Sequence, residues 1–406
     1  MVFVGLLLIL ACGSWIDAVL GYLSIGKPGL LYLWMPYPGF DFVAYTLQFP
    51  YLHTTRFFTL PVLPWVYPAP AIFVLYPFYK VVAVTNRVTG FIVFSLAALI
   101  ANLFVAWRFK EALTRRGLSR KAASGLIVST AIMGWPLYFS LQRGNIESLL
   151  WIGIALGVLC FAKGRYARAA ALFGVVGSVK LYPLLFLALL LKPRRYREIG
   201  LGIGIAIVVT LAGLRFLNPD VSYAWRRIVA GIQHWTAITT SVYPATGIGT
   251  DHSILGLLRQ CTHGTILHYP YALNWYLGIA AVVTCAVFFL RLFSWPRPNQ
   301  VLFIACATVL LPPTSFDYTL VSILIPWGWI VMLCVEQARA RQSVNRFFLF
   351  FALFAVALAP LSFLHSHSGS GMFVEGPARA VALLALMTFA ALVPLPENAR
   401  LPYLQT

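Results

Sequence analysis

The stretch VTGFIVFSLAALIANLFVAW (residues 88–107), followed by RFKEALTRRGLSRK (residues 108–121), decides how the chain is built. The first part is apolar and long enough to cross a hydrocarbon core of ~30 Å as a helix. The second part is the most basic loop of the sequence, and short loops rich in Lys and Arg stay on the cytoplasmic side of a membrane. Together they predict a membrane-spanning helix that ends in the cytoplasm.

The composition extends this prediction to the whole chain of 406 residues, because 60% of them are hydrophobic and 10% are charged. A mean hydropathy of +0.83 leaves too little polar surface for a soluble domain of this length. The net charge of +19 would suit nucleic acid, but Lys and Arg occur in short clusters between apolar runs, as the orientation of a membrane protein requires. We therefore expect an integral membrane protein with no nucleic-acid partner.

The other apolar runs give a topology once the loop at 108–121 is fixed in the cytoplasm. A first helix at Val2–Leu23, which carries Asp17, is expected to be retained, because it lacks a basic region and a convincing cleavage site. The run Ala71–Val84 is expected to be re-entrant or interfacial, because a full crossing would place the basic loop outside. The later spans are predicted at about residues 122–141, 146–162, 167–179, 181–191, 199–217, 271–290, 300–312, 318–335, 346–363 and 378–394.

Three of these segments, 167–179, 181–191 and 300–312, are too short for a full crossing and are typical of half-length helices that line an enclosed cavity. The topology is that of an all-α polytopic protein, predicted as one domain (1–406) in the plasma (inner) membrane with both termini cytoplasmic. Two exoplasmic loops are expected, at about 25–87 and 218–270. Eight prolines between positions 28 and 70 predict that the first loop is structured and contains short helices.

This topology places most polar residues that could do chemistry on the exoplasmic side, and Asp41 is the strongest candidate among them. It lies in YPGFDFVAY (residues 37–45), in a chain with only 11 Asp and Glu residues. An acid at a membrane interface indicates function, and a carboxylate partly withdrawn from water is suited to accept a proton from a hydroxyl. The alternative is an acid at the headgroup boundary or a helix cap.

Three further charged residues follow on the same predicted side. Lys180, on a turn between two short apolar segments, is costly to place without an anionic partner, unless it extends to the headgroups. Arg143 and Glu147 are four residues apart and could pair with each other at the start of a helix. Alternatively, Arg143 binds a lipid phosphate, to which a guanidinium can donate two hydrogen bonds.

The segment TGIGTDHSILGLL (residues 246–258) passes from glycines through polar groups to an apolar helical pattern. Either Asp251 or Ser253 is expected to cap that helix. The glycine spacing is not that of a phosphate-binding loop, and the scattered histidines of the long loop do not predict a metal site. Asp317 either caps the next span or lines the same cavity as Asp41.

In order and spacing, these segments resemble the membrane-embedded GT-C glycosyltransferases of family 87. The segments that carry the resemblance are DFVAY (41–45), YPAPA (67–71) with YP (76–77), RGNIE (143–147), SVKLYP (178–183), DHSILGLL (251–258) and PTSFDY (313–318). The sequence departs from the family pattern in having Gly-Asn-Ile-Glu for Gly-Gln-x-Asn, and Phe-Asp-Tyr for a run with histidine. No role for a histidine is therefore transferred to residues 316–318.

The resemblance implies a GT-C-like bundle of about 11–13 transmembrane or half-membrane helices. It also implies a hexosyltransferase that moves a mannose-like hexose, or a pentose, from a polyprenyl-phosphate sugar to a lipid or glycan acceptor, with inversion and with Asp41 as the general base. No cofactor or essential metal is expected, because Lys and Arg can neutralise the phosphate that leaves. The residues expected to bind substrate are Lys180, Arg143, Glu147, Tyr45, Asp251, His252, Asp317 and Tyr318.

Two other classes of protein remain open at this point. A secondary transporter or a lipid or glycolipid flippase would use broken helices and buried charges to form a polar mid-membrane site, although the sequence has no repeated halves. A non-catalytic assembly subunit would leave Asp41 dispensable.

Overall fold

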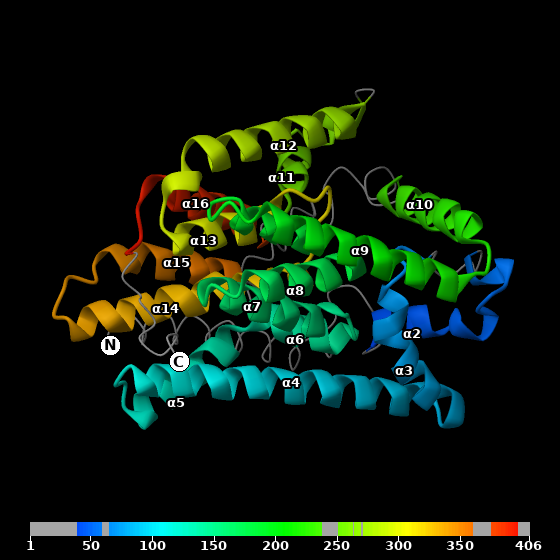
Figure 1. Ribbon diagram of the computed structural model, residues 1–406, viewed down its shortest axis with the longest axis horizontal. Helices are drawn as coiled ribbons and strands as arrows, with labels where there is room; N and C mark the ends of the chain where they lie inside the picture. Colours follow the sequence, from blue (N-terminus) through cyan, green and yellow to red (C-terminus); the bar gives the residue numbers. More distant parts are fainter. Residues whose placement is uncertain are drawn as a thin grey trace, which may run out of the picture. The chain divides into compact units, whose positions relative to one another are not determined.

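The computed structural model describes residues 39–58, 65–237, 251–262, 264–268, 271–359 and 375–396. Within these ranges every regular element is an α-helix or a 3-10 helix (Figure 1), so the prediction of an all-α protein is confirmed. The expected first span at Val2–Leu23, with Asp17, lies outside the described residues.

Four helices of the described part are long and apolar enough to cross a membrane. They are α4 (Arg87–Arg115), α9 (Tyr196–Leu217), α12 (Ala272–Leu290) and the continuous run of η7 (Asp317–Ile323) and α14 (Leu324–Arg339). Large apolar side chains of α4, α9 and α12 are exposed on the protein surface, Trp275 and Leu290 among them. Such helices need a lipid environment, and the chain is a polytopic membrane protein.

The other apolar helices are shorter. They are α3 (Ala71–Val84), α7 (Glu147–Ala162), α8 (Tyr166–Val179), α13 (Arg297–Leu310), α15 (Arg346–Leu358), α16 (Glu375–Leu392) and the 3-10 helix η3 (Tyr182–Leu190). The expectation of half-length helices near 167–179, 181–191 and 300–312 is thereby confirmed. The span predicted at 122–141 is broken into α5 (Arg120–Met133) and α6 (Trp135–Arg143), with a bend of 56° between Arg120–Thr130 and α6. Gly134 and Pro136 flank the break, where a regular helix is least stable.

The chain falls into two compact units. The first, here called the Asp41 unit, comprises Tyr37–Asn102 and Phe139–Tyr243. In its centre α7, α8, η3 and α9 pack together (Figure 1). Glycine makes the close approach possible, because a Cβ atom on Gly174 would collide with the carbonyl group of Gly202. The loop before α3 forms α2 (Phe40–Thr46), η1 (Phe49–Tyr51) and η2 (Thr55–Phe58), which confirms a structured loop with short helices in its described part.

The second unit, here called the Asp317 unit, comprises Leu103–Tyr138 and the described residues from Asp251 onward. Its core is α13, which is buried along almost its whole length and packs on α14 and α16. The Asn299 side chain of α13 donates hydrogen bonds to the carbonyl groups of Ala390 (2.9 Å) and Val393 (2.8 Å). These bonds satisfy carbonyl groups at the carboxyl end of α16 that its own helix leaves unpaired. The prediction of a single domain remains a prediction.

The segment 218–270 was expected to be a long exoplasmic loop, and its described parts are largely helical. It contains α10 (Val221–Ala237), α11 (Ile254–Cys261) and η5 (Thr265–His268). Helix α10 has an apolar face, with Ala224, Ile228 and Gly231 buried, and a polar face with arginines. A search for uniformly apolar spans does not detect such an amphipathic helix.

Candidate active site

Two glycines bring the Asp41 loop against the turn between α6 and α7. Gly39 (φ 77°) and Gly144 (φ 66°) both have the left-handed backbone that favours glycine. A Cβ atom on Gly144 would lie 2.6 Å from Cβ of Phe42, and one on Gly39 would lie 2.8 Å from the Phe91 ring. The backbone N–H of Gly39 donates to the carbonyl oxygen of Gln142 at 2.6 Å. Side chains from these two distant segments therefore meet at one place.

The Asp41 carboxylate accepts three hydrogen bonds at this place. Arg143 donates from Nη2 to Oδ1 at 2.6 Å and from Nε to Oδ2 at 3.1 Å, and Asn145 donates from Nδ2 to Oδ2 at 2.7 Å. Paired donation from one guanidinium to both oxygens is the strongest geometry for such a contact. The Asp41 side chain is 10% exposed and that of Arg143 is 19% exposed. Asp41 is thus neither a surface acid nor a helix cap.

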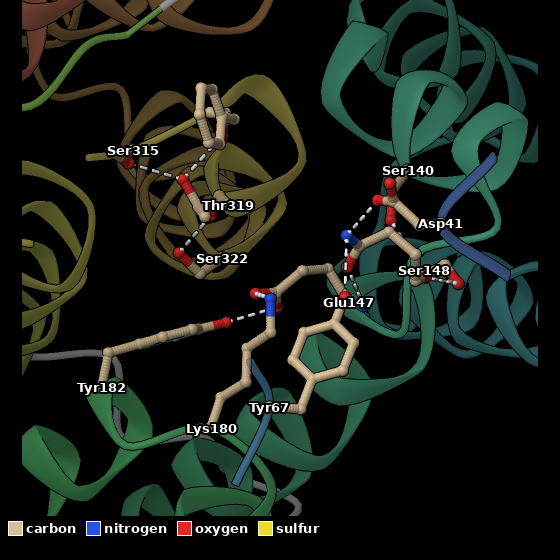
Figure 2. A network of polar contacts seen from close by, with 12 residues as sticks. Asp41, Tyr67, Ser140, Glu147, Ser148, Lys180, Tyr182, Ser315, Thr319 and Ser322 are labelled. Carbon is tan, nitrogen blue, oxygen red and sulfur yellow. Dashed lines mark hydrogen bonds and ion pairs between the residues drawn. The ribbon is translucent and has the colours of Figure 1, made fainter. Parts of the chain in front are cut away.

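A second ion pair lies beside the first (Figure 2). Glu147 is fully buried and accepts from Lys180 Nζ at 2.6 Å and from the Tyr182 hydroxyl at 2.5 Å. Asn145 connects the two pairs, since its Oδ1 accepts from the backbone N–H of Glu147 at 3.1 Å. The same Asn145 amide also donates to the Tyr67 hydroxyl at 3.3 Å. Asp41, Asn145 and Glu147 therefore form one connected polar network.

Aromatic rings border this network. Tyr45 is buried, with its ring 4.4 Å from that of Tyr67 and 5.6 Å from that of Trp65, measured between centroids. Lys180 Nζ lies 5.2 Å from the centroid of the Tyr67 ring, which adds a cation–π contact. Tyr45, which was predicted to bind substrate, thus contacts the network through the Tyr67 ring.

The structure decides between the alternatives for three of the predicted residues. Arg143 and Glu147 do not pair with each other, because Arg143 binds Asp41 and Glu147 binds Lys180. This alternative for the two residues is therefore wrong. Lys180 has the anionic partner that its position predicts and is 14% exposed. The functional roles of these residues remain predictions.

The Asp317 unit holds a separate group of buried polar residues. Arg379 donates from Nη1 to Asp317 Oδ1, and Trp135 donates from Nε1 to Asp317 Oδ2 at 2.7 Å. His252 Nδ1 lies 3.7 Å from Asp317 Oδ1. Phe316 occupies the N-cap position of η7, so Asp317 lies inside the first turn. The expectation that Asp317 caps this helix is therefore wrong, and a cavity shared with Asp41 remains a prediction.

Asp251 and Ser253 join two loops of this unit. Ser253 is the N-cap of α11, as predicted, and its Oγ accepts from the backbone N–H of Gly256 at 2.8 Å. Asp251 Oδ1 accepts from the backbone N–H groups of Ser253 and Ser315, both at 3.0 Å. Asp251 is almost fully buried in this loop, and burial raises its pKa. Asp251 thereby fixes the loop before α11 to the loop before η7.

A row of hydroxyl groups continues along η7 (Figure 2). The hydroxyls of Ser315 and Thr319 are 2.7 Å apart, and the Ser322 hydroxyl donates to the carbonyl oxygen of Thr319 at 3.0 Å. His252 Nε2 lies 3.3 Å from Thr319 Oγ1. Tyr318, which was predicted to bind substrate, is half-buried, with its ring 5.8 Å from that of Phe316.

Several members of both groups were not predicted from the sequence as site residues. Asn145, Tyr67 and Tyr182 were noted only as parts of motifs, and Arg379 and Trp135 were not selected at all. A cation inside an otherwise apolar segment is costly without a partner, and this signal could have identified Arg379. Pairing of Trp135 with Asp317 carries no local signal, because the two residues are 182 positions apart.

Within the parts of the chain that the structure describes, no three His, Cys, Asp or Glu side chains gather as a metal site would require. The expectation of a reaction without an essential metal remains a prediction.

Comparison with known families gives one match. The model of glycosyltransferase family 87 matches residues 65–322. The chain belongs to glycosyltransferase family 87. The resemblance found in the sequence is thereby confirmed, and family 87 membership favours a membrane glycosyltransferase over a transporter or flippase. No curated protein and no solved structure matches the chain.

The matched range contains Arg143, Asn145, Glu147 and Lys180, but it begins after Asp41. The link between Asp41 and the family 87 region is therefore structural, through the hydrogen bonds that Arg143 and Asn145 donate to its carboxylate.

Proposed function

We propose that this family 87 protein transfers a mannose-like hexose, or a pentose, from a polyprenyl-phosphate sugar to a hydroxyl of a lipid or glycan acceptor. Transfer takes place on the exoplasmic face of the plasma (inner) membrane, inverts the anomeric carbon and uses Asp41 as the general base. The observation that carries the proposal is the position of the Asp41 carboxylate, which is mostly buried and held by Arg143 and Asn145 in a membrane protein of a glycosyltransferase family.

The charges of the site suit this reaction. The acceptor oxygen forms a bond to the anomeric carbon, the bond from that carbon to the phosphate oxygen breaks, and the acceptor proton passes to Asp41. The donor phosphate, a diester with one negative charge, leaves as a monoester with up to two. Because protonation neutralises Asp41 in the same step, the Arg143 guanidinium, 2.6 Å from Asp41, becomes available to the leaving phosphate. Stabilisation of developing charge by fixed groups is usually the largest catalytic contribution.

Asn145 and Lys180 position and support this chemistry. Asn145 fixes Asp41 Oδ2 at 2.7 Å, so that the lone pairs of the carboxylate have a defined direction. Lys180 adds a second positive charge and is held at 2.6 Å by Glu147. We propose that these two cations replace a metal ion at the leaving phosphate.

The predicted residues of the Asp317 unit differ in accessibility. Asp251, His252 and Asp317 are almost fully buried, whereas Tyr318 is half-buried. We propose that the three buried residues contribute to substrate binding by fixing the start of η7, which holds Tyr318, and that Tyr318 contacts the sugar or the acceptor.

The test is transfer of labelled sugar from polyprenyl-phosphate donors by the purified protein, with Asp41→Asn and, as a control, the half-buried acid variant Glu111→Gln alongside. Loss of a general base lowers the rate by about 10²–10⁴-fold, so Asp41→Asn should lose transfer while Glu111→Gln keeps it. Thermal unfolding should show that both variants are folded. Activity should persist in EDTA. Transfer that survives in a folded Asp41→Asn protein would overturn the role of this residue.

A further inference from the structure

The Asp41 unit contains a cavity of about 580 Å³ that the network around Asp41 does not use. It lies between the end of α8, the start of η3, residues 203–214 of α9 and the first turns of α10. Helices α8, α9 and α10 are neighbours in this unit (Figure 1). The lining includes Ser178, Leu184, Ala206, Leu211 and Trp225.

The lining is apolar, and it opens on the side of a membrane span. Ile207 is 54% exposed and Leu211 is 50% exposed, and both belong to α9, which is long and apolar enough to cross the membrane. Burial of such surface against hydrocarbon rather than water is favourable by about 25 cal/mol per Å². A groove on the lipid side of a span therefore suits a chain of the bilayer more than a polar ligand.

One end of the groove carries positive charge. Helix α10 begins at Val221, close after the end of α9 at Leu217, and presents Arg226 to the groove. The exposed position of Arg226 beside Trp225, opposite the buried face of α10, is typical of a helix that lies in the headgroup region. A guanidinium there favours an anionic head group, such as a phosphate, over a neutral one.

The groove and the Asp41 network share one turn of the chain. Ser178 and Leu181 line the groove, and Lys180 lies between them. The Lys180 ammonium reaches Glu147, which Asn145 connects to Asp41. A lipid in this groove would thus contact the turn that supplies a cation to the candidate active site.

We propose that this groove binds the hydrocarbon chain of the lipid-phosphate donor, with Arg226 favouring its negatively charged phosphate at the rim. The identity of the lipid rests on the proposed function, whereas the location of the chain rests on the groove itself. Substitutions that fill the groove therefore reduce donor binding without touching the residues of the Asp41 network.

The test uses the purified full chain and a polyprenyl phosphate that carries a photoreactive diazirine on its chain and has no sugar. Mass spectrometry should place the labelled residues on the groove-lining parts of α8, η3, α9 and α10. Leu211→Trp and Ala206→Trp should reduce labelling several-fold, and the matched variant Val208→Trp, on an exposed face of α9 outside the groove, should not. If Ala206→Trp does not fold, Leu211→Trp, at an exposed position, still decides the outcome.

The charge is tested by competition. Arg226→Gln should weaken competition by unlabelled polyprenyl phosphate about tenfold, the value of one charge-assisted hydrogen bond, and should leave competition by neutral polyprenol unchanged. The neighbouring Arg227→Gln, which does not line the groove, is the matched control. Labelling outside the groove-lining parts of α8, η3, α9 and α10, or equal competition by phosphatidic acid, would overturn the proposal.

The two proposals fail in different ways. Specific labelling of the groove in a protein without sugar transfer would contradict the proposed function and leave the lipid site intact. Transfer that is unaffected by Leu211→Trp would contradict the groove and leave the proposed function intact.

Discussion

Glu147 gives the sharpest prediction of stability. Its side chain is fully buried, and it accepts from Lys180 at 2.6 Å and from Tyr182 at 2.5 Å. Glu147→Gln keeps the size of the side chain but leaves the Lys180 ammonium, which is 14% exposed, without its counter-ion. Loss of one partner of a buried pair costs about 3–5 kcal/mol. Because Lys180 retains some contact with solvent, we expect a cost of about 3 kcal/mol.

The measurement is unfolding of the purified protein in mixed micelles, followed by helical circular dichroism. The double variant Glu147→Gln/Lys180→Met should recover most of the loss, because neither charge is then left alone. Glu111→Gln serves as the control, since Glu111 pairs with Arg108 at the surface, where such pairs contribute about 0–1 kcal/mol. A loss below about 1 kcal/mol for Glu147→Gln, or a double variant that is merely additive, would refute the reasoning.

Three further predictions concern single residues. Gly144→Ala should destabilise by about 2 kcal/mol or more and lower transfer, because its φ is 66° and the new Cβ would lie 2.6 Å from Cβ of Phe42; thermal unfolding and transfer rates check this. Ser253→Ala should cost about 1 kcal/mol in unfolding experiments, because α11 loses its N-cap bond to Gly256. Burial raises the pKa of Asp251 above its ordinary value of 3.8, so the unfolding free energy should fall as the pH rises from that value through the folded-state pKa. Asp251→Asn should remove this pH dependence, because Asn does not titrate, and should keep both backbone hydrogen bonds to Oδ1. The measurement is the unfolding free energy of the parent and the variant across the pH range.

The sequence was sufficient to predict the long membrane spans but not every helix. Apolar runs and basic loops predicted α4, α9 and α12 closely, because hydrocarbon imposes a length and a composition on each crossing. Helix α10 was missed, because its apolar face alternates with arginines and does not form a run. The break between α5 and α6 was also missed, although Gly134 and Pro136 mark it in the sequence.

For the site, the sequence identified the charged residues but not all of their partners. Asp41, Arg143, Glu147 and Lys180 stand out because charge is rare and costly in an apolar chain. Spacing suggested that Arg143 pairs with Glu147, four residues away, and this was wrong. Gly144 breaks the helix between them with a φ of 66°, so the two side chains do not share a helical face.

The presence of a buried ion pair does not show that the pair stabilises the fold. The pair between Asp41 and Arg143 can therefore be tested for a role in stability and a role in chemistry separately. Replacing both partners of such a pair by hydrophobic groups of similar size is often harmless, whereas removing one is not. Asp41→Leu/Arg143→Met should therefore unfold within about 1 kcal/mol of the parent, while Arg143→Met alone should be less stable. If the pair is present for chemistry, the stable double variant will have lost sugar transfer. A double variant that is stable and fully active would mean that another group accepts the proton.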